Sequence, residues 1–269
     1  MNREQAGKHV TLSRLVLVFC CAIFLRNEVA EAGTWTLQKS REVETASPLV
    51  RHVEESVSDG SSAVKLHVVL FDPKKCALTV VDNPSGSETL GSAMKKRGAL
   101  AGVNGGYFHP DHTPLGLEIS DALMVHPIER ARLLSGFLAV HNGWGVLWRA
   151  TEFAQSRQNL PRHALQSGPF FIDRGKAVVG LESTRSASRT IVLAGVDNGI
   201  RALLVSEPVT LAEMAQILAG IPVAPGVKIG RALNLDGGSS TGMWVKAEPE
   251  PFYLREGKDV RNYLAVVPR

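Results

Sequence analysis

Leu233-Asn-Leu-Asp-Gly-Gly-Ser-Ser-Thr-Gly242 places one carboxylate, Asp236, at the end of a short apolar run and follows it with a turn rich in glycine and hydroxyl groups. Gly237 and Gly238 accept backbone angles closed to other residues and let a chain approach a ligand closely. Ser239 and Ser240 add hydrogen-bond donors and acceptors at the same place. The pattern is typical of a strand that delivers an acid into a binding site, and also of an ordinary tight turn.

A second segment, Ala101-Gly-Val-Asn-Gly-Gly-Tyr-Phe108, has the same order of features. A small-residue run leads to the amide of Asn104, then to the pair Gly105 and Gly106, then to aromatic residues that begin with Tyr107. Asn-Gly is also the commonest signal of a two-residue hairpin turn, so a hairpin remains the alternative. Two such elements, about 130 residues apart, together favour a shared site.

Four segments in this order resemble the phosphodiester glycosidase family. They are Asn104–Phe108, Gln166–Gly175, Ser188–Thr190 and Asn234–Ser240. The resemblance spans roughly Val64 to Pro268, with one departure: Ser239 follows the glycine pair directly, where family members often have a further Gly or Pro. It implies a hydrolase that cleaves the glycosidic bond of a sugar-1-phosphodiester, releasing the sugar and a phosphomonoester.

The resemblance implies a catalytic set of Asp236, Asn104 and Arg189. Asp236 would act as nucleophile or as base for water, because a phosphate leaving group reduces the need for a strong general acid. The guanidinium of Arg189 offers a bidentate fork to phosphate oxygens. Asn104 would orient a sugar hydroxyl or a phosphate oxygen. The expected substrate-binding residues are Gly105, Gly106, Tyr107, Glu118, Thr190, Gly237, Gly238, Ser239 and Ser240, with the glycine N–H groups forming anion-binding nests.

Two weaker candidates lie near these motifs. Glu118 is a possible second carboxylate or a solvated strand residue. The loop His109-Pro-Asp-His112 contains two imidazoles and a carboxylate, but adjacent residues seldom converge on one ion without a further ligand. We therefore predict no cofactor and no metal site, and read this loop as polar. Ser239 is not in a G-x-S-x-G elbow, which argues against serine hydrolase chemistry.

Hydrophobic periodicity predicts many strands and few helices. Strands are expected over 63–71, 78–82, 99–103, 122–125, 137–141, 146–149, 177–179, 190–196 and 200–205, with hairpin turns at Asn142-Gly143 and Asp197-Asn-Gly199. A short helix is expected over 88–96, and a second one starts at the capping box Thr210–Glu213. This pattern favours a single α+β domain with largely antiparallel or mixed sheets and a few short helices.

The N-terminus reads as a targeting signal. Basic residues precede the apolar run Leu15–Leu25, and Ala30-Glu-Ala32 offers a cleavage site. We expect residues 1–32 to be a signal peptide, or alternatively an N-terminal anchor, which makes the protein exported, periplasmic or secreted. Residues 33–61 are expected to be a polar leader, as a strand or an arm, and residues 62–269 the catalytic domain.

Charge and cysteine content limit the partners. The net charge of +4 is mild, and no basic stripe suggests nucleic acid. No second hydrophobic span follows the signal, so we expect no stable membrane insertion after cleavage. Cys76 is the one cysteine after residue 32 and is expected to be a buried small hydrophobe. The expected partner is a glycosyl phosphodiester or a cell-envelope carbohydrate.

Two other functions remain open at this stage. One is a metal-dependent phosphodiesterase that cleaves the P–O bond, with Asp236 and the His109–His112 loop as ligands. The other is a non-catalytic binder of cell-envelope polysaccharide, with Tyr107 and Phe108 as platforms for sugar rings.

Overall fold

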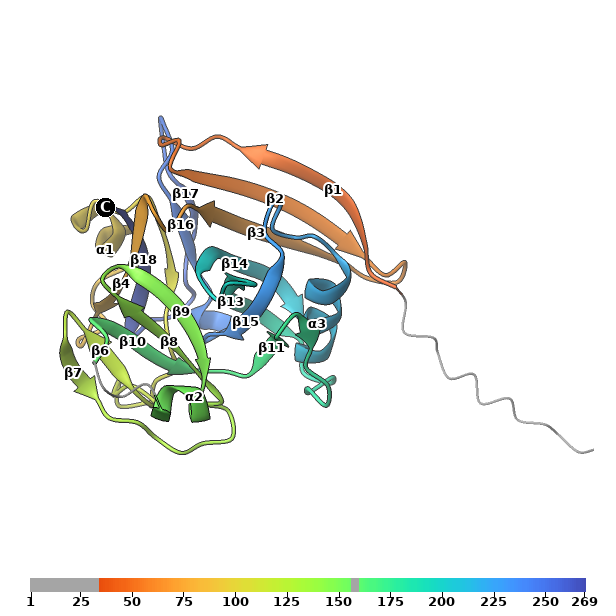
Figure 1. Ribbon diagram of the computed structural model, residues 1–269. Coiled ribbons are helices and arrows are strands. Elements are labelled where there is room, and N and C mark those ends of the chain that lie inside the picture. The colour runs from red at the N-terminus through yellow and green to blue at the C-terminus, as the bar shows by residue number, and fades with distance from the viewer. Residues whose placement is uncertain (1–33, 156–159) are drawn as a thin grey trace, which may run out of the picture. The chain divides into compact units, whose positions relative to one another are not determined.

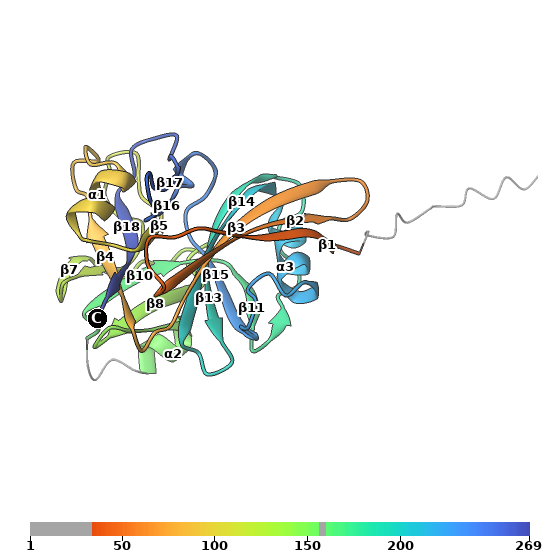
Figure 2. The ribbon, with the colours of Figure 1, turned by 90° about the horizontal axis from the view of Figure 1, so that it is seen from above.

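The computed structural model describes residues 34–155 and 160–269, and Gly33–Arg269 forms one compact unit. The predicted signal peptide lies outside the described residues. Three antiparallel sheets and three short helices make up the unit, which confirms the predicted α+β class (Figures 1 and 2). Within the described residues, no helix combines the length and apolar character needed to cross a membrane.

The largest sheet has eight strands in the order β1-β2-β3-β14-β13-β15-β11-β12. Their bounds are Thr36–Val43, Val50–Ser58, Ala63–Phe71, Ile200–Val209, Ala187–Gly195, Ile229–Asn234, Phe170–Asp173 and Lys176–Ala177, in that order. Strands β13 and β14 are joined by the predicted turn at Asp197–Gly199, where Asn198 has a φ of 63°. The predicted strand 177–179 is wrong in extent, because β12 ends at Ala177 and Val179 is 90% exposed.

Two five-stranded sheets complete the unit. One has the order β7-β6-β10-β8-β9, with bounds Leu123–His126, Glu118–Ser120, His163–Ser167, Gly136–His141 and Trp144–Arg149. The other has the order β17-β16-β5-β18-β4, with bounds Phe252–Leu254, Met243–Val245, Ala101–Asn104, Asn262–Pro268 and Cys76–Asp82. Val69, Leu138 and Leu264, one from each sheet, belong to the same buried apolar cluster, so the three sheets share a core.

The helices cover sheet faces. Helix α1 (Leu90–Lys96) packs on β5 and β18, α2 (Ala150–Gln155) follows β9, and α3 (Leu211–Gly220) lies against β11 (Figure 1). The predicted capping box at the start of α3 is confirmed: the Thr210 hydroxyl accepts from the Glu213 amide, and the Glu213 carboxylate accepts from the Thr210 amide. Such a cap satisfies two helix-end donors that otherwise lack partners.

Residues 33–61, predicted as a leader strand or arm, contain two strands of the large sheet. Strand β2 pairs with β3 along its full length, and β1 pairs with β2. Val53 and Val57 face the core as a strand pattern requires, but the buried positions of β2 also include His52 and Glu55. These two polar residues interrupt the apolar alternation by which strands are recognised in a sequence.

The buried His52 on β2 and the half-buried His67 on β3 form an imidazole pair. Their nearest ring nitrogens are 3.2 Å apart, and the His52 ring centroid lies 4.6 Å from that of Phe252. Burial, followed by the proximity of His67, lowers the pKa of His52 to about 4. Imidazoles that stay neutral in the fold but bind protons in the unfolded chain destabilise the fold in acid.

We expect acid to weaken the fold through this pair. As pH falls from about 6.5 to about 4, the His52 contribution lowers the free energy of unfolding by about 2–3 kcal/mol, because the unfolded chain binds the proton first. His52→Leu should remove this part of the loss, as measured by urea unfolding at each pH. His109→Gln, a partly exposed histidine elsewhere, serves as control; equal pH curves for both variants would contradict the prediction.

Candidate active site

The register of two neighbouring strands brings Arg189 and Asp236 together at the same end of these strands in the large sheet. Strands β13 and β15 are antiparallel and Ile191 pairs with Asn234, so the start of β13 lies beside the end of β15. The amide of Leu235 extends this pairing by donating to the Thr190 carbonyl at 2.8 Å. Asp236 follows immediately. Residues 47 positions apart in the chain thus meet because of strand register.

Strand β5 of the neighbouring sheet holds the acid-bearing turn. The backbone N–H of Asp236 donates to the backbone carbonyl of Gly105 at 3.1 Å, and the side-chain NH2 group of Asn104 donates to the backbone carbonyl of Asp236 at 2.7 Å. The side-chain oxygen of Asn104 accepts from the Thr190 hydroxyl at 2.6 Å and from the backbone N–H of Gly242 at 3.2 Å. Asn104 and Thr190 are fully buried, so they position Asp236 through its backbone and neither side chain faces a ligand.

This arrangement corrects two expectations from the sequence. The Asn104 side chain does not reach a sugar or phosphate oxygen, because it is fully buried and its hydrogen bonds described above go to protein groups. The Asn104-Gly105 pair does not close a hairpin either: β5 pairs with β16 and β18, and not with the next strand along the chain. The buried amide instead joins the two sheets.

The converging strand ends form a pocket of about 660 Å³. Six residues predicted from the sequence line it, namely Tyr107, Arg189, Asp236, Gly237, Gly238 and Ser239. The pocket also contains side chains that sequence reasoning did not assign, among them Lys258, Arg185, Glu182 and Asn234. The predicted Asn104, Gly105, Gly106, Glu118, Thr190 and Ser240 lie outside this lining.

Asp236 is a mostly buried carboxylate with three donors around it. One oxygen accepts from the Gly237 amide at 2.9 Å, and the other accepts from the Ser240 hydroxyl at 2.5 Å and lies 3.9 Å from the Lys258 ammonium. Burial raises the pKa of Asp236 above its ordinary value, while Ser240, Lys258 and the Gly237 amide oppose the rise. A raised pKa makes a carboxylate a stronger base near neutral pH.

Arg189 is a buried arginine that lines the same pocket. Its Nε donates to the Val209 carbonyl at 2.8 Å and one terminal nitrogen donates to the Arg185 carbonyl at 2.9 Å. Among the described residues, no carboxylate forms an ion pair with it, and burial lowers the pKa of its guanidinium. Two backbone carbonyls thus orient the planar group, and its remaining N–H donors and its charge are available to an anion.

The two glycine pairs differ in function. Gly105 and Gly106 donate their N–H groups to the backbone and side-chain oxygens of Asn262, so the predicted anion nest at this pair is wrong. A Cβ on Gly105 would lie 1.9 Å from the Asn262 side chain, which explains the need for glycine there. Gly237 and Gly238 do line the pocket, and Gly238 has a φ of 61°, a conformation that favours glycine.

Glu118 is buried beneath the Gly105–Gly106 turn. Its carboxylate accepts from the Asn262 amide at 2.6 Å, and its exposed fraction is zero, which excludes the alternative of a solvated strand residue. Burial raises its pKa to about 8. Glu118 therefore does not line the pocket, and it supports the Gly105–Gly106 turn through Asn262.

Sequence reasoning missed Lys258 because no motif surrounds it. Its ammonium lies 4.6 Å from the centroid of the Phe108 ring and close to Asp236. Asn234 was part of a motif, but its side chain was not assigned: its amide donates to the Tyr107 hydroxyl at 2.6 Å, and its own oxygen has no partner among the described residues. The Tyr107 hydroxyl in turn donates to the Gly168 carbonyl at 2.9 Å.

The His109–His112 loop does not converge on the acid. Asp111 accepts from the hydroxyl and amide of Thr113, the His112 ring lies tilted against Phe108 with the centroids 5.0 Å apart, and His109 faces Glu129 at 3.6 Å. Across residues 34–155 and 160–269, no group of three or more His, Cys, Asp or Glu side chains has the proximity needed to hold a metal ion.

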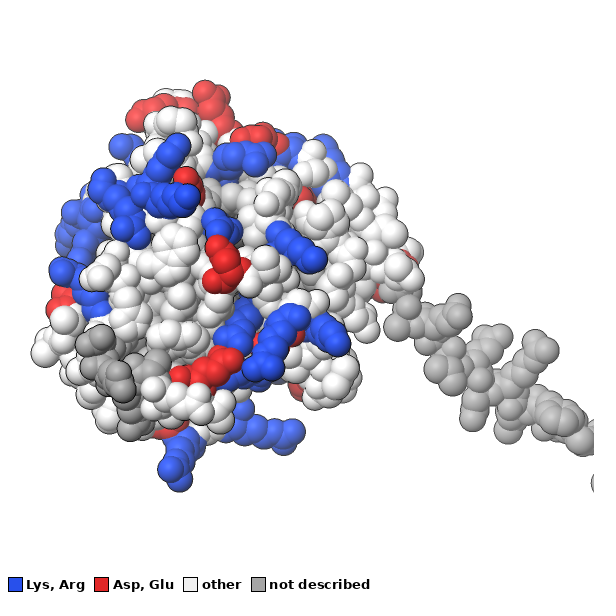
Figure 3. Space-filling view, in the orientation of Figure 1, with Lys and Arg blue, Asp and Glu red and all other residues white. Residues whose placement is uncertain are grey.

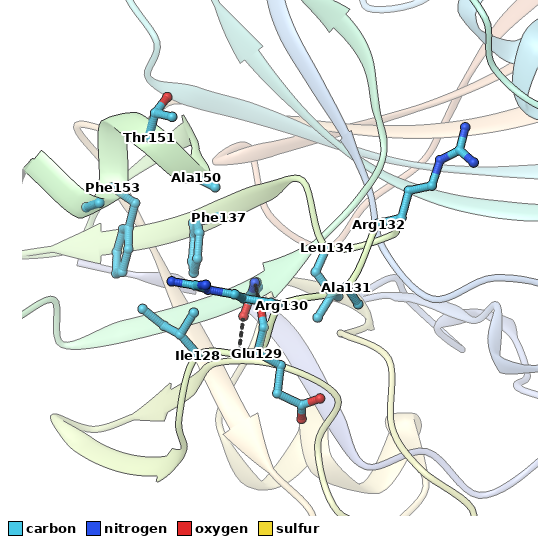
Figure 4. Close-up of a pocket in the computed structure, with 12 residues that line it drawn as sticks. Ile128, Glu129, Arg130, Ala131, Arg132, Leu134, Phe137, Ala150, Thr151 and Phe153 are labelled. Atoms are coloured by element: carbon cyan, nitrogen blue, oxygen red, sulfur yellow. Dashed lines mark hydrogen bonds between the residues drawn. The ribbon is translucent and has the colours of Figure 1, made fainter.

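A second cavity, of about 600 Å³, lies between α2 and the segment 128–134. Phe137 and Phe153 lie side by side on its wall with stacked rings, and Arg132 points away from them (Figure 4). Its lining is largely apolar and, apart from Gln166 at the start of one family segment, contains none of the residues that the motifs single out. The candidate active site is therefore the pocket that holds Asp236 and Arg189.

Asn104→Ala should destabilise the fold. It leaves the Thr190 hydroxyl, the Gly242 amide and the Asp236 carbonyl without their buried partner. Unsatisfied buried groups of this kind reduce the free energy of unfolding by about 2–4 kcal/mol. Urea unfolding measures the loss, with Gln38→Ala, an exposed amide on β1, as control. A loss below about 0.5 kcal/mol would show that the amide does not join the sheets.

The chain is similar to known proteins in sequence pattern and in fold. The sequence model described as phosphodiester glycosidase matches residues 97–267. The fold is similar to the zebrafish N-acetylglucosamine-1-phosphodiester alpha-N-acetylglucosaminidase catalytic domain auto-inhibited by its pro-peptide, with a TM-score of 0.61, 17% identity, and coverage of 88% of this chain and 89% of that one. A hypothetical protein from Synechocystis has a TM-score of 0.55 and 15% identity, with 88% and 68% covered. No curated protein sequence matches the chain.

Proposed function

Since the chain belongs to the phosphodiester glycosidase family, we propose that it hydrolyses the bond between the anomeric carbon of a sugar and a phosphodiester oxygen. One observation carries the proposal: Asp236 and Arg189 line the same pocket, each fixed by hydrogen bonds to the protein. A carboxylate and a guanidinium in one pocket match a substrate that presents an electrophilic carbon next to an anion.

Arg189 binds the phosphate in this proposal. Its fork is oriented by two carbonyls, and Arg185 and Lys258 add positive charge to the same pocket. The N–H groups of Gly238 and Ser239 have no acceptor among the described residues and lie in the pocket lining. Together these donors stabilise the charge that grows on the phosphate as the C–O bond breaks.

Asp236 supplies the carboxylate at the anomeric carbon. Either its oxygen attacks that carbon and water then releases the sugar, or it takes a proton from a water molecule that attacks directly. In both cases the electron pair of the cleaved C–O bond leaves with the phosphate, and the products are a free sugar and a phosphomonoester. The anomeric configuration of the released sugar distinguishes the two routes.

The sugar is bound by groups on the Tyr107 side of the pocket. The Tyr107 ring gives an apolar surface there, and the Asn234 side-chain amide holds the Tyr107 hydroxyl at 2.6 Å. Asn104, Thr190 and Ser240 act as positioning residues, because they contact Asp236 or its turn and not the pocket.

Incubation with UDP-N-acetylglucosamine in water labelled with oxygen-18 tests the proposal. The expected products are free N-acetylglucosamine and UDP without label in the phosphate, because the bond cleaved is the C–O bond. A 4-nitrophenyl phosphodiester, incubated in parallel, should release no nitrophenol. Oxygen-18 in the phosphate would show that the enzyme cleaves the P–O bond, and this result would overturn the proposal.

Export is part of the same proposal. The basic residues, the apolar run Leu15–Leu25 and the Ala30-Glu-Ala32 site fit a cleaved signal. The expected mature N-terminus is Gly33, and Edman sequencing of the protein purified from outside the cytoplasm checks it. An intact Met1 would leave the N-terminal anchor as the alternative.

A further inference from the structure

A second cleft, the basic cleft, lies at the far ends of the strands that form the active site. Arg231 at the start of β15, Val196 after the end of β13 and Arg174 after β11 line it, together with Trp148, Lys176 and Lys228. Its volume is about 650 Å³. Because Gly195 lies six positions after Arg189 along β13, the two sites are about 20 Å apart.

The acidic groups of this region are already neutralised. Glu152 accepts two hydrogen bonds of 2.6 Å from Arg231, which lowers the pKa of its carboxyl to about 2. Asp173 lies 3.0 Å from the Arg149 guanidinium and 3.1 Å from that of Arg231. These carboxylates pair with Arg231 in the lining of the cleft and with Arg149 outside it, and leave the other cations of the cleft without a strong partner.

Three cations therefore remain at the rim. The Arg174 side chain is 81% exposed and only reaches 3.6 Å from Glu152. Lys176 and Lys228 are exposed, and the described residues include no ion-pair partner for either. Lys and Arg side chains gather beside α2 on the face seen in Figure 3, with a few acidic side chains among them. Such a surface attracts an anion that can contact several cations at once.

The walls of the basic cleft also offer apolar contacts. The half-buried ring of Trp148 and the 68% exposed side chain of Val196 give apolar surface between the charges. The wall is tightly packed at Gly230, because a Cβ there would lie 2.4 Å from the Gly195 carbonyl oxygen and only glycine fits. Aromatic and apolar surface suits the C–H faces of sugar rings, while the cations suit carboxylate or phosphate substituents.

We propose that the basic cleft binds an anionic carbohydrate chain. A nucleic acid would need a longer basic stripe than three rim cations, and the net charge of the chain is only +4. A membrane surface would need several apolar groups that protrude, whereas Val196 is the one strongly exposed apolar side chain of the lining and the Trp148 ring is half-buried. The inference goes beyond the proposed hydrolysis, because it holds whatever reaction occurs at Asp236.

Binding of fluorescent alginate fragments to the full-length protein, followed by anisotropy, tests the cleft. Lys176→Gln/Lys228→Gln should weaken binding about tenfold and reduce its salt dependence. Lys39→Gln/Lys65→Gln, which removes the same charge from exposed positions on β1 and β3, should bind like the parent protein. Asp236→Asn should also bind like the parent, which separates this result from the failure or success of the hydrolysis.

Three results would overturn the proposal. The first is equal binding by the two double-lysine variants, and the second is equal binding of neutral dextran of the same length. The third is a loss in the Lys176/Lys228 variant that affects anionic phospholipid vesicles or duplex DNA but not alginate. Hydrolysis of UDP-N-acetylglucosamine by the Lys176/Lys228 variant should be unchanged, because neither lysine lines the active site.

Discussion

Asp236→Asn is expected to lower kcat for UDP-N-acetylglucosamine by about 10³-fold or more while the protein remains folded. The amide keeps the size of the carboxylate, its oxygen can still accept from the Gly237 amide, and its NH2 group can donate to the Ser240 hydroxyl, so the turn has little reason to move. It can neither attack the anomeric carbon nor take a proton from water. Release of sugar over time, measured beside urea unfolding, separates loss of chemistry from loss of fold.

The pH dependence of kcat/KM of the parent enzyme tests the role of Asp236 independently. Asp236 works in its ionised form, so kcat/KM should fall as pH drops through the pKa of its carboxyl, which burial raises above the ordinary value. Asp111→Asn, an exposed acid in the neighbouring loop, should leave both kcat and the profile unchanged. A fully active Asp236→Asn protein would remove Asp236 from the reaction.

Arg189→Lys is expected to reduce kcat/KM by about 10²-fold, with the loss shared between KM and kcat. Lysine keeps a positive charge but loses the planar fork, and it cannot donate to both the Val209 and the Arg185 carbonyl while facing a phosphate. Steady-state kinetics with a sugar phosphodiester measures the effect, and inorganic phosphate as a competitive inhibitor should bind correspondingly more weakly.

Arg162→Lys is the matched control for this variant. Arg162 is an exposed arginine paired with Asp121, remote from the pocket lining, and its replacement should leave kcat/KM within a factor of two. If Arg189→Lys behaved in the same way, the phosphate would have to be bound by Arg185 and Lys258 instead. The kinetics of the Arg185 and Lys258 variants would then decide the assignment.

Much of the architecture could be predicted because its signals are local. The Thr210–Glu213 capping box and the Asn142-Gly143 turn depend on neighbouring residues, and the structure confirms both. Strand β3 was predicted with its observed bounds, since its inward positions are apolar. Strand β2 was not recognised, because the buried His52 and Glu55 interrupt its pattern, and only pairing with β3 identifies it.

The sequence by itself determined that Asp236 ends a strand in a glycine turn and that the family motifs occur in order. Only the tertiary structure decided which side chains face the pocket. Antiparallel register places Arg189 beside Asp236. Asn104 and Thr190 also belong to family motifs, but their side chains form buried hydrogen bonds that join two sheets. Lys258 enters the pocket without any motif. Side-chain direction depends on pairing between strands far apart in the chain, and such pairing leaves no local trace in the sequence.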